Sequence, residues 1–150
     1  MLNEFRCRVS SGISYRLRDF SGGKYSRYCW PVSIILLLTE RCNARCVHCD
    51  IWKSRGGEPT PEHSAWKKLL ADIAGWLGPA QVTLSGGEAL LRPYTPELLA
   101  YGASRGLMME LLTHGYWLDQ CRIEAAAAAR PWRITMSLDG IGDVHAAARR

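Results

Sequence analysis

Short apolar runs alternate with amphipathic stretches from residue 33 to the end of the chain. The apolar runs cover residues 33–39, 81–85, 107–112 and 133–138. Their nearly continuous hydrophobicity is typical of strands that are buried on both faces of a parallel sheet. The alternation predicts an α/β fold with about four parallel strands, joined by right-handed helical crossovers.

The clearest helical pattern follows the first strand. Apolar side chains recur at i, i+3, i+4 and i+7 from Trp66 to Leu77 and form one stripe. Thr60 is the expected N-cap, with Pro61 in the first helical position, and Gly78 should end the helix. Three further helices are expected between and after the later strands. The first should start with Thr95 as its N-cap, followed by Pro96, and end at Gly106. The second should run from about Asp119 to Pro131, and Asp143 should cap the third.

Each predicted strand is followed at once by a polar or glycine-rich cluster. The clusters are the cysteine loop 42–49, Gly86–Glu88, Thr113–Gly115 and Asp139–Gly140. In parallel α/β sheets, chemistry collects beyond the carboxyl ends of the strands. The four clusters should therefore meet at one edge of the sheet.

The first cluster spaces three cysteines, Cys42, Cys46 and Cys49, as C-x3-C-x2-C. Three thiolates can bind three irons of a cubane cluster and leave the fourth iron open. An open position is typical of a catalytic metal site, whereas structural sites are normally closed. Arg41 and Arg45 are expected to favour the deprotonated sulfurs.

Other interpretations of these cysteines stay open. Their spacing also marks one face of a helix, although polar neighbours make a poor core stripe. A zinc site needs a fourth ligand, for which the adjacent candidate is His48. An electron-transfer cluster usually has a fourth cysteine, and Cys29 is the candidate.

Composition narrows the function classes. The chain has 150 residues, enough for one domain with a hydrophobic core. Residues 1–30 carry six basic and two acidic side chains, whereas the other 120 carry thirteen and twelve. This balance predicts a basic, solvated extension over residues 1–32 and no nucleic-acid partner for the rest. Neither a membrane span nor a signal peptide is evident, so a cytoplasmic protein without disulfides is expected.

The C-x3-C-x2-C motif directly after a first strand resembles the radical S-adenosylmethionine (SAM) superfamily. The string Thr39–Asn43 resembles the version in members that modify peptides or build cofactors. The resemblance covers residues ~33–146 and implies an incomplete, radical SAM-type partial β/α barrel. It also implies a [4Fe–4S] cluster on Cys42, Cys46 and Cys49, whose open iron is chelated by the amino and carboxylate groups of SAM.

The same resemblance implies the chemistry and the partners. One electron from the reduced cluster cleaves SAM to methionine and a 5′-deoxyadenosyl radical, which abstracts hydrogen from a substrate carbon. A peptide or a small-molecule cofactor precursor is the implied substrate class. A flavodoxin or a ferredoxin is the implied electron donor.

SAM contacts are also implied at the other strand ends. They are His48 near the adenine, Gly86, Gly87 and Glu88 at the methionyl amine, and Ser137 and Asp139 at the ribose. Paired glycines let a backbone approach a ligand closely, and a carboxylate accepts hydrogen bonds from an ammonium group. Ser137 and Asp139 should point to the same side, because alternate strand residues share a face.

Some residues receive no chemical role. His114 stands where the family usually has asparagine, and His145 completes an Asp-Gly-x4-His pattern seen in this group. Cys121 is expected to be packed within its helix. Family barrels usually have six βα units. Residues 33–150 are therefore expected to be a truncated core domain whose fourth strand is an unpaired edge.

Overall fold

The computed structural model describes residues 13–16, 18–22, 31, 33–54, 59–116 and 119–149. Strands and helices alternate along this part of the chain, as the hydrophobic pattern predicts. The elements are β1 (Ser33–Leu37), η2 (Ile51–Ser54), α2 (His63–Leu77), β2 (Gln81–Ser85), η3 (Ala89–Leu91), α3 (Thr95–Ser104), β3 (Met108–Thr113), α4 (Gln120–Ala128), β4 (Arg133–Met136) and α5 (Asp143–Ala148).

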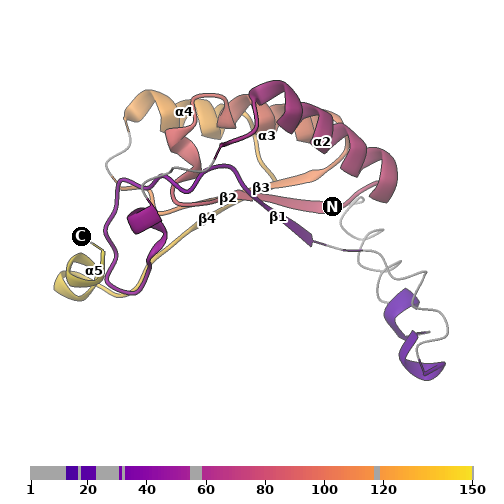
Figure 1. Ribbon diagram of the computed structural model, residues 1–150, viewed down its shortest axis with the longest axis horizontal. Coiled ribbons are helices and arrows are strands. Elements are labelled where there is room, and N and C mark those ends of the chain that lie inside the picture. The colour runs from indigo at the N-terminus through magenta and orange to yellow at the C-terminus, as the bar shows by residue number, and fades with distance from the viewer. Residues whose placement is uncertain are drawn as a thin grey trace.

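The strands form one parallel sheet in the order β1-β2-β3-β4 (Figure 1). In the register, Ile35 is opposite Thr83, Thr83 is opposite Glu110, and Glu110 is opposite Arg133. Each strand therefore lies beside the next one in the sequence, and a helix crosses between them. Among the described elements, β4 pairs with β3 alone, so the predicted unpaired edge is present.

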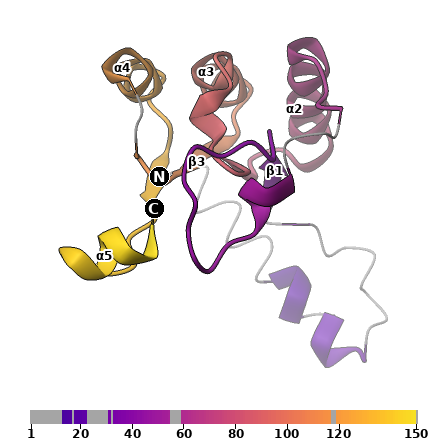
Figure 2. The same ribbon diagram turned by 60° about the vertical axis from the view of Figure 1, so that its left-hand side comes forward.

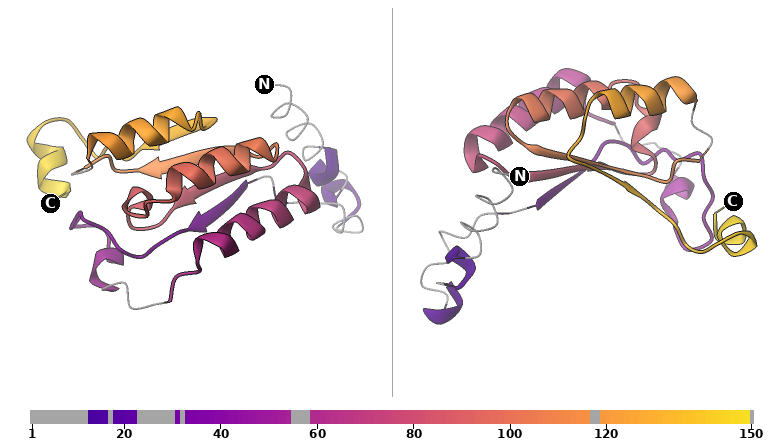
Figure 3. Two further views of the ribbon diagram at one scale, coloured as in Figure 1. Left: turned by 90° about the horizontal axis from the view of Figure 1, so that it is seen from above. Right: turned by 180° about the vertical axis from the view of Figure 1, so that it is seen from behind.

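Helices α2, α3 and α4 lie side by side on one face of the sheet (Figures 2 and 3). The core between the layers contains Val82, Leu84, Met109 and Leu111 from the two central strands, all at most 1% exposed. Close contact is possible because α3 carries a glycine, Gly102, where a Cβ would lie 2.2 Å from the sulfur of Met109. Figure 2 shows α5 apart from this layer, on the other side of the sheet.

The sheet face opposite the helices carries a polar network centred on Glu110. Its carboxylate accepts hydrogen bonds from Arg133 Nε (2.8 Å), Thr83 Oγ1 (2.9 Å), Thr135 Oγ1 (2.5 Å) and Gln81 Nε2 (2.6 Å). Burial alone would raise the pKa of Glu110, but these hydrogen bonds outweigh it and lower the pKa to about 2. The network links β2, β3 and β4 through side chains as well as backbone.

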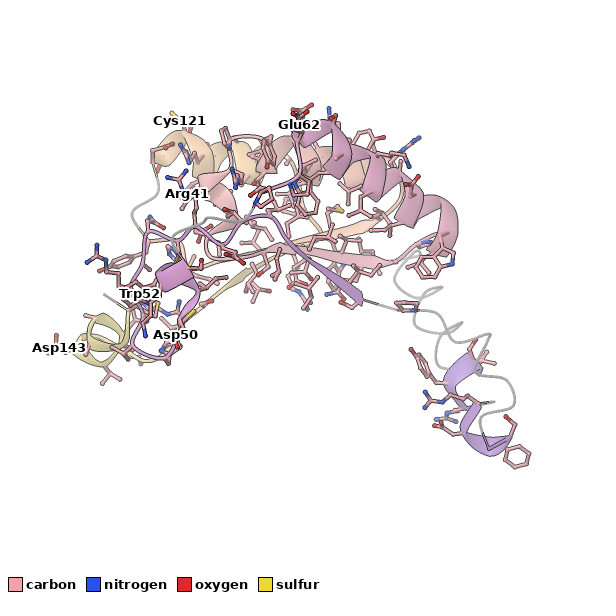
Figure 4. All side chains as sticks on the ribbon, viewed as in Figure 1. Arg41, Asp50, Trp52, Glu62, Cys121 and Asp143 are labelled. Atoms are coloured by element: carbon pink, nitrogen blue, oxygen red, sulfur yellow. The ribbon has the colours of Figure 1, made fainter. Side chains whose placement is uncertain are left out.

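Two predicted N-caps are wrong. Helix α2 begins at His63 after Glu62, whose position is labelled in Figure 4. The hydroxyl of Thr60 instead accepts a hydrogen bond from Arg92 Nη2 at 2.6 Å. Thr95 lies inside α3, where its hydroxyl donates to the Ala89 carbonyl at 2.6 Å. In both cases a tertiary partner has taken the hydroxyl that the local pattern assigned to a helix end.

The predictions for the remaining helix ends are partly right and partly wrong. The Asp119 carboxylate caps α4 by accepting from the Arg122 backbone N–H at 2.9 Å, which agrees with the predicted start at about Asp119. Asp143 is the first residue of α5 and not its cap, because Gly142 occupies that position with a φ of 58°. Gly78 ends α2 with a φ of 67°, as predicted.

The basic segment 1–32 lies mostly outside the described residues. Of its six basic side chains only Arg16 and Arg18 are described, and Arg18 pairs with Asp19 at 2.6 Å. Cys7 and Cys29 also lie outside, so a ligand role for Cys29 is untested. In the described part of the chain, no helix has the length and apolar character needed to cross a membrane.

Candidate functional site

The cysteine loop lies over the carboxyl edge of the sheet and closes one side of a cavity of about 310 Å³. Cys42, Cys46 and Cys49 all line this cavity, together with residues from the ends of β2, β3 and β4. The three thiols are free, with Cys46 buried and the other two partly exposed. Residues from three of the four predicted strand-end clusters therefore meet at this cavity. Asp139 and Gly140 of the fourth cluster do not line it, although Ser137, just before them, does.

Gly86 and Gly87 bring the end of β2 against the backbone of the cysteine loop. The Gly87 N–H donates to the Thr39 carbonyl at 2.8 Å, and the Glu88 N–H donates to the Arg41 carbonyl at 3.0 Å. A Cβ on Gly86, which has a φ of 136°, would lie 2.2 Å from the Thr39 oxygen. Both glycines line the cavity, and their small size also lets the two loops touch.

Glu88 is 1% exposed and is not among the residues that line the cavity. Its carboxylate accepts from Thr113 Oγ1 at 2.9 Å, from the His114 N–H at 3.1 Å and from the Leu90 N–H at 3.0 Å. These bonds tie the end of β2 to the end of β3 directly beneath the cysteine loop. Contact between Glu88 and a methionyl amine stays a prediction.

His114 is a site residue to which the sequence pattern assigned no chemistry. Its Nε2 lies 3.7 Å from Cys42 Sγ and 3.2 Å from Glu88 Oε2, and its Nδ1 accepts from the Tyr116 N–H at 2.9 Å. Burial lowers the pKa of His114, the Glu88 carboxylate raises it, and Arg149 lowers it again, with a net decrease. The only sequence signal was its position at a strand end.

Ser137 and Asp139 follow β4 but differ in their surroundings. Ser137 lines the cavity, and its N–H donates to the Thr113 carbonyl at 3.0 Å. Asp139 instead pairs with Arg149, Nε to Oδ2 at 2.5 Å, and lies 3.7 Å from His48 Nε2. Their predicted common face assumed a strand through Leu138, and this premise is wrong because β4 ends at Met136.

His145 has a structural role that accounts for the Asp-Gly-x4-His spacing. The backbone N–H of Asp139 donates to His145 Nδ1 at 3.3 Å, so the first turn of α5 folds back onto the segment after β4. This contact places Arg149, at the end of α5, beside both Asp139 and the cysteines.

Arg149 is the cation that faces the thiols. Its Nη1 lies 3.9 Å from Cys46 Sγ. The hydrogen bond to Asp139 and the charge of that carboxylate, with smaller contributions from Cys46 and Cys42, outweigh burial and raise the pKa of Arg149. Arg41 and Arg45 are exposed. The pKa of Cys42 is raised, chiefly by burial and further by Glu88 and the other two cysteines. Neither Arg41 nor Arg45 is among the groups that shift the pKa of Cys42, so their effect on the thiolates stays a prediction.

The donor set of the cavity fits a cubane cluster with an open iron. Three free thiols from one loop face one cavity, and no disulfide among the described cysteines competes for them. Within the described residues, no group of three or more His, Cys, Asp or Glu side chains is arranged to hold a metal ion. A cubane needs one thiolate on each of three separate irons, so its ligands need not converge on one point.

The cysteine loop also borders a second cavity, and a further described cysteine lies on α4. A second cavity of about 360 Å³ is lined by Cys42, Arg45, Trp52 and Lys53. Figure 4 shows Asp50 and Trp52 at the same end of the molecule as α5. In Figure 4, Cys121 lies at the same end of the molecule but in the helix layer, in the first turn of α4. It is exposed, so the prediction that it is packed is wrong.

Comparison with known proteins identifies the family. Residues 36–150 match the Radical SAM superfamily. AdoMet-dependent heme synthase of Methanosarcina barkeri is 36% identical over 113 residues, or 73% of this chain and 32% of that protein. PqqA peptide cyclase of Rhodopseudomonas palustris is 31% identical over 122 residues, or 80% of this chain and 32% of that protein. The chain thus spans about a third of the length of these relatives.

Solved structures show the same fold at low sequence identity. Streptococcus suis SuiB bound to precursor peptide SuiA has a TM-score of 0.65 at 17% identity, covering 80% of this chain and 27% of SuiB. Native anSMEcpe with bound AdoMet, another name for SAM, also has a TM-score of 0.65 at 17% identity, covering 80% of this chain and 35% of anSMEcpe. These neighbours confirm the partial β/α barrel, and the family's cofactors are a [4Fe–4S] cluster and SAM. The chain belongs to the radical SAM superfamily.

Proposed function

We propose that this chain carries the SAM-cleaving site of a radical SAM enzyme. The observation that carries the proposal is the shared cavity, which brings Cys42, Cys46 and Cys49 together with Gly86, Gly87 and Ser137. When bound, the cluster and SAM supply a one-electron reductive cleavage that yields methionine and a 5′-deoxyadenosyl radical, which takes hydrogen from a substrate carbon.

The protein's own residues would bind the cluster and SAM, orient SAM, and keep water out of the cavity. The three thiolates of Cys42, Cys46 and Cys49 would hold three irons of the cluster, in a cavity that Gly86 and Gly87 also line. Ser137 and His48 both line the cavity, which supports the proposal that Ser137 contacts the ribose and His48 the adenine. Glu88 accepts from an ammonium group only if one of its present donors gives way, since Thr113, His114 and Leu90 already donate to it. Asp139 reaches a ribose only if Arg149 releases it.

A peptide or a cofactor precursor is the substrate class that we propose. This proposal is supported by relatives whose names are PqqA peptide cyclase and AdoMet-dependent heme synthase, and by the fold shared with SuiB bound to precursor peptide SuiA. We also propose that residues 33–150 are part of a larger core domain and that residues 1–32 are a basic extension.

An electron donor of the flavodoxin or ferredoxin class is the partner that we propose for reduction. Cys42 lines the main cavity and also the second cavity, whose other lining residues include the exposed cations Arg45 and Lys53. An acidic protein surface would be attracted to these cations. Reduction by such a donor should therefore slow as ionic strength rises.

The test is anaerobic reconstitution of the chain with iron and sulfide, followed by reduction and addition of SAM. Formation of 5′-deoxyadenosine, together with a SAM-dependent change in the EPR spectrum of the reduced cluster, supports the proposal. A cluster whose spectrum is insensitive to SAM, with no cleavage, would contradict it and point to a closed electron-transfer site.

A further inference from the structure

The ring of His114 is oriented by the backbone of the segment that follows it. Its Nδ1 accepts the N–H of Tyr116, two residues along the chain, at 2.9 Å. A ring nitrogen that accepts a hydrogen bond carries no proton, so the proton of the neutral ring lies on Nε2. The Tyr116 carbonyl in turn accepts from Asn43 Nδ2 of the cysteine loop at 3.0 Å. The ring is therefore held at the junction of the end of β3 with that loop.

The Nε2–H of His114 faces two acceptors. Cys42 Sγ lies 3.7 Å away, within hydrogen-bond reach of a sulfur, and Glu88 Oε2 lies 3.2 Å away. Both His114 and Glu88 are buried, at 9% and 1% exposure. Glu88 has three further donors, so its carboxylate does not depend on this ring for its hydrogen bonds. For the sulfur of Cys42, by contrast, the Nε2–H of His114 is a neutral donor that the Tyr116 N–H holds in place.

We propose that His114 is a positioning residue of the iron–sulfur site, which donates its Nε2–H to the Cys42 thiolate and thereby makes the cluster easier to reduce. The inference rests on the proposed function, since it requires Cys42 to be a cluster ligand. A hydrogen bond to a ligand sulfur stabilises the extra negative charge of the reduced state more than that of the oxidised state. Partners of this kind beyond the ligands themselves tune the properties of metal sites.

The experiment measures the midpoint potential of the reconstituted cluster without SAM, so it does not depend on turnover. Phenylalanine in H114F fills the space of the ring but has no N–H, whereas the side-chain amide in H114Q replaces the donor. The matched control is H63F, which removes a histidine at the start of α2 that stacks on Tyr94. Iron and sulfide content and circular dichroism are recorded for every variant.

At a fixed solution potential, H114F should show a severalfold to tenfold lower ratio of reduced to oxidised cluster. For a one-electron couple, tenfold corresponds to a 59 mV lower midpoint. H114Q should recover most of the difference, and H63F should match the unsubstituted chain. An H114F cluster with full iron content and an unchanged midpoint overturns the inference but leaves the proposed function standing. Failure of the unsubstituted chain to form any cluster overturns both.

A second measurement does not require H114F to fold. With ¹⁵N-labelled histidine, pulsed EPR of the reduced cluster should detect a ¹⁵N coupling that is present in the unsubstituted chain and lost in H114Q. A spectrum with the same histidine coupling in both proteins, or with none in either, contradicts the hydrogen bond from His114.

Discussion

Gly87 packs directly against the carbonyl group of Arg41, since a Cβ on Gly87 would lie 2.4 Å from that oxygen. The neighbouring N–H of Glu88 donates to the same oxygen at 3.0 Å. A glycine at this position thus holds the cysteine loop against the end of β2, and the loop in turn presents its thiols to the cavity. The strand-end glycines act on the protein's own backbone as well as lining the ligand cavity.

The substitution G87A should separate the cysteine loop from β2. The added methyl group would clash with the backbone of the cysteine loop at Arg41. The variant should therefore lose about 1–3 kcal/mol of stability and most of its cluster. Urea unfolding and iron content per chain measure these effects. The control is G75A in α2, where a Cβ meets nothing within 4 Å and where alanine should add about 0.5–1 kcal/mol. A G87A protein with full iron content would refute this role of Gly87.

The substitution C46A should abolish both the cluster and SAM cleavage. Removing one of three thiolates leaves an iron without its protein ligand, and the remaining two cannot hold a cubane with one open position. The absorbance of the sulfur-to-iron charge-transfer bands measures the cluster, and formation of 5′-deoxyadenosine measures SAM cleavage. The matched control is C121A, because Cys121 is exposed on α4 and should be dispensable. A cleavage-competent C46A variant would rule out the cluster assignment.

The substitution S137A should weaken SAM binding while leaving the cluster intact. Ser137 lines the cavity, and loss of one hydrogen bond to a buried ligand hydroxyl corresponds to about a 3- to 30-fold higher Kd. Titration of the reconstituted protein with SAM, followed by EPR, gives the Kd. S104A is the control, since the Ser104 hydroxyl only donates to the Tyr101 carbonyl at the end of α3. Equal SAM affinity in S137A and S104A would remove Ser137 from the site.

Glu110 should make the stability of the sheet depend on pH in the acidic range. Its pKa in the folded chain is about 2, below the ordinary value of 4.5, because its hydrogen bonds favour the carboxylate. The stabilisation is therefore fully present above about pH 4.5 and is lost progressively as the pH falls toward 2. The variant E110Q should be less stable by about 2 kcal/mol at pH 7, and this difference should shrink between pH 4.5 and 3.

Chemical denaturation across that pH range tests the role of Glu110. The variant E124Q provides the control, because Glu124 is exposed on α4 and accepts only from Gln120. The difference in free energy of unfolding between E110Q and the unsubstituted chain must become smaller as the pH falls. The corresponding difference for E124Q should be small at every pH. A difference for E110Q that does not change from pH 7 to pH 3 would show that the network does not depend on the charged carboxylate.

Local pattern was enough to predict the order of the elements and some of their bounds. The strand Gln81–Ser85 agrees residue for residue, and the strand predicted over residues 107–112 is shifted by one residue, to Met108–Thr113. These segments are determined by apolar runs and by glycine, whose effects act within a few residues. The helix caps were less predictable, because the Thr60 hydroxyl accepts from Arg92, 32 residues away, and the Thr95 hydroxyl donates to the Ala89 carbonyl instead of to its own helix end.

The sequence by itself identified the family and predicted the iron ligands, since the cysteine spacing lies within one loop and the strand before it is clear in the hydrophobic pattern. Only the tertiary structure decided which side chains surround those cysteines. His114 and Arg149 reach Cys42 and Cys46 from the end of β3 and the end of α5, across 72 and 103 residues of sequence. Such contacts depend on how parallel strands align in register, and a linear pattern of residue types carries no information about distances between separate elements.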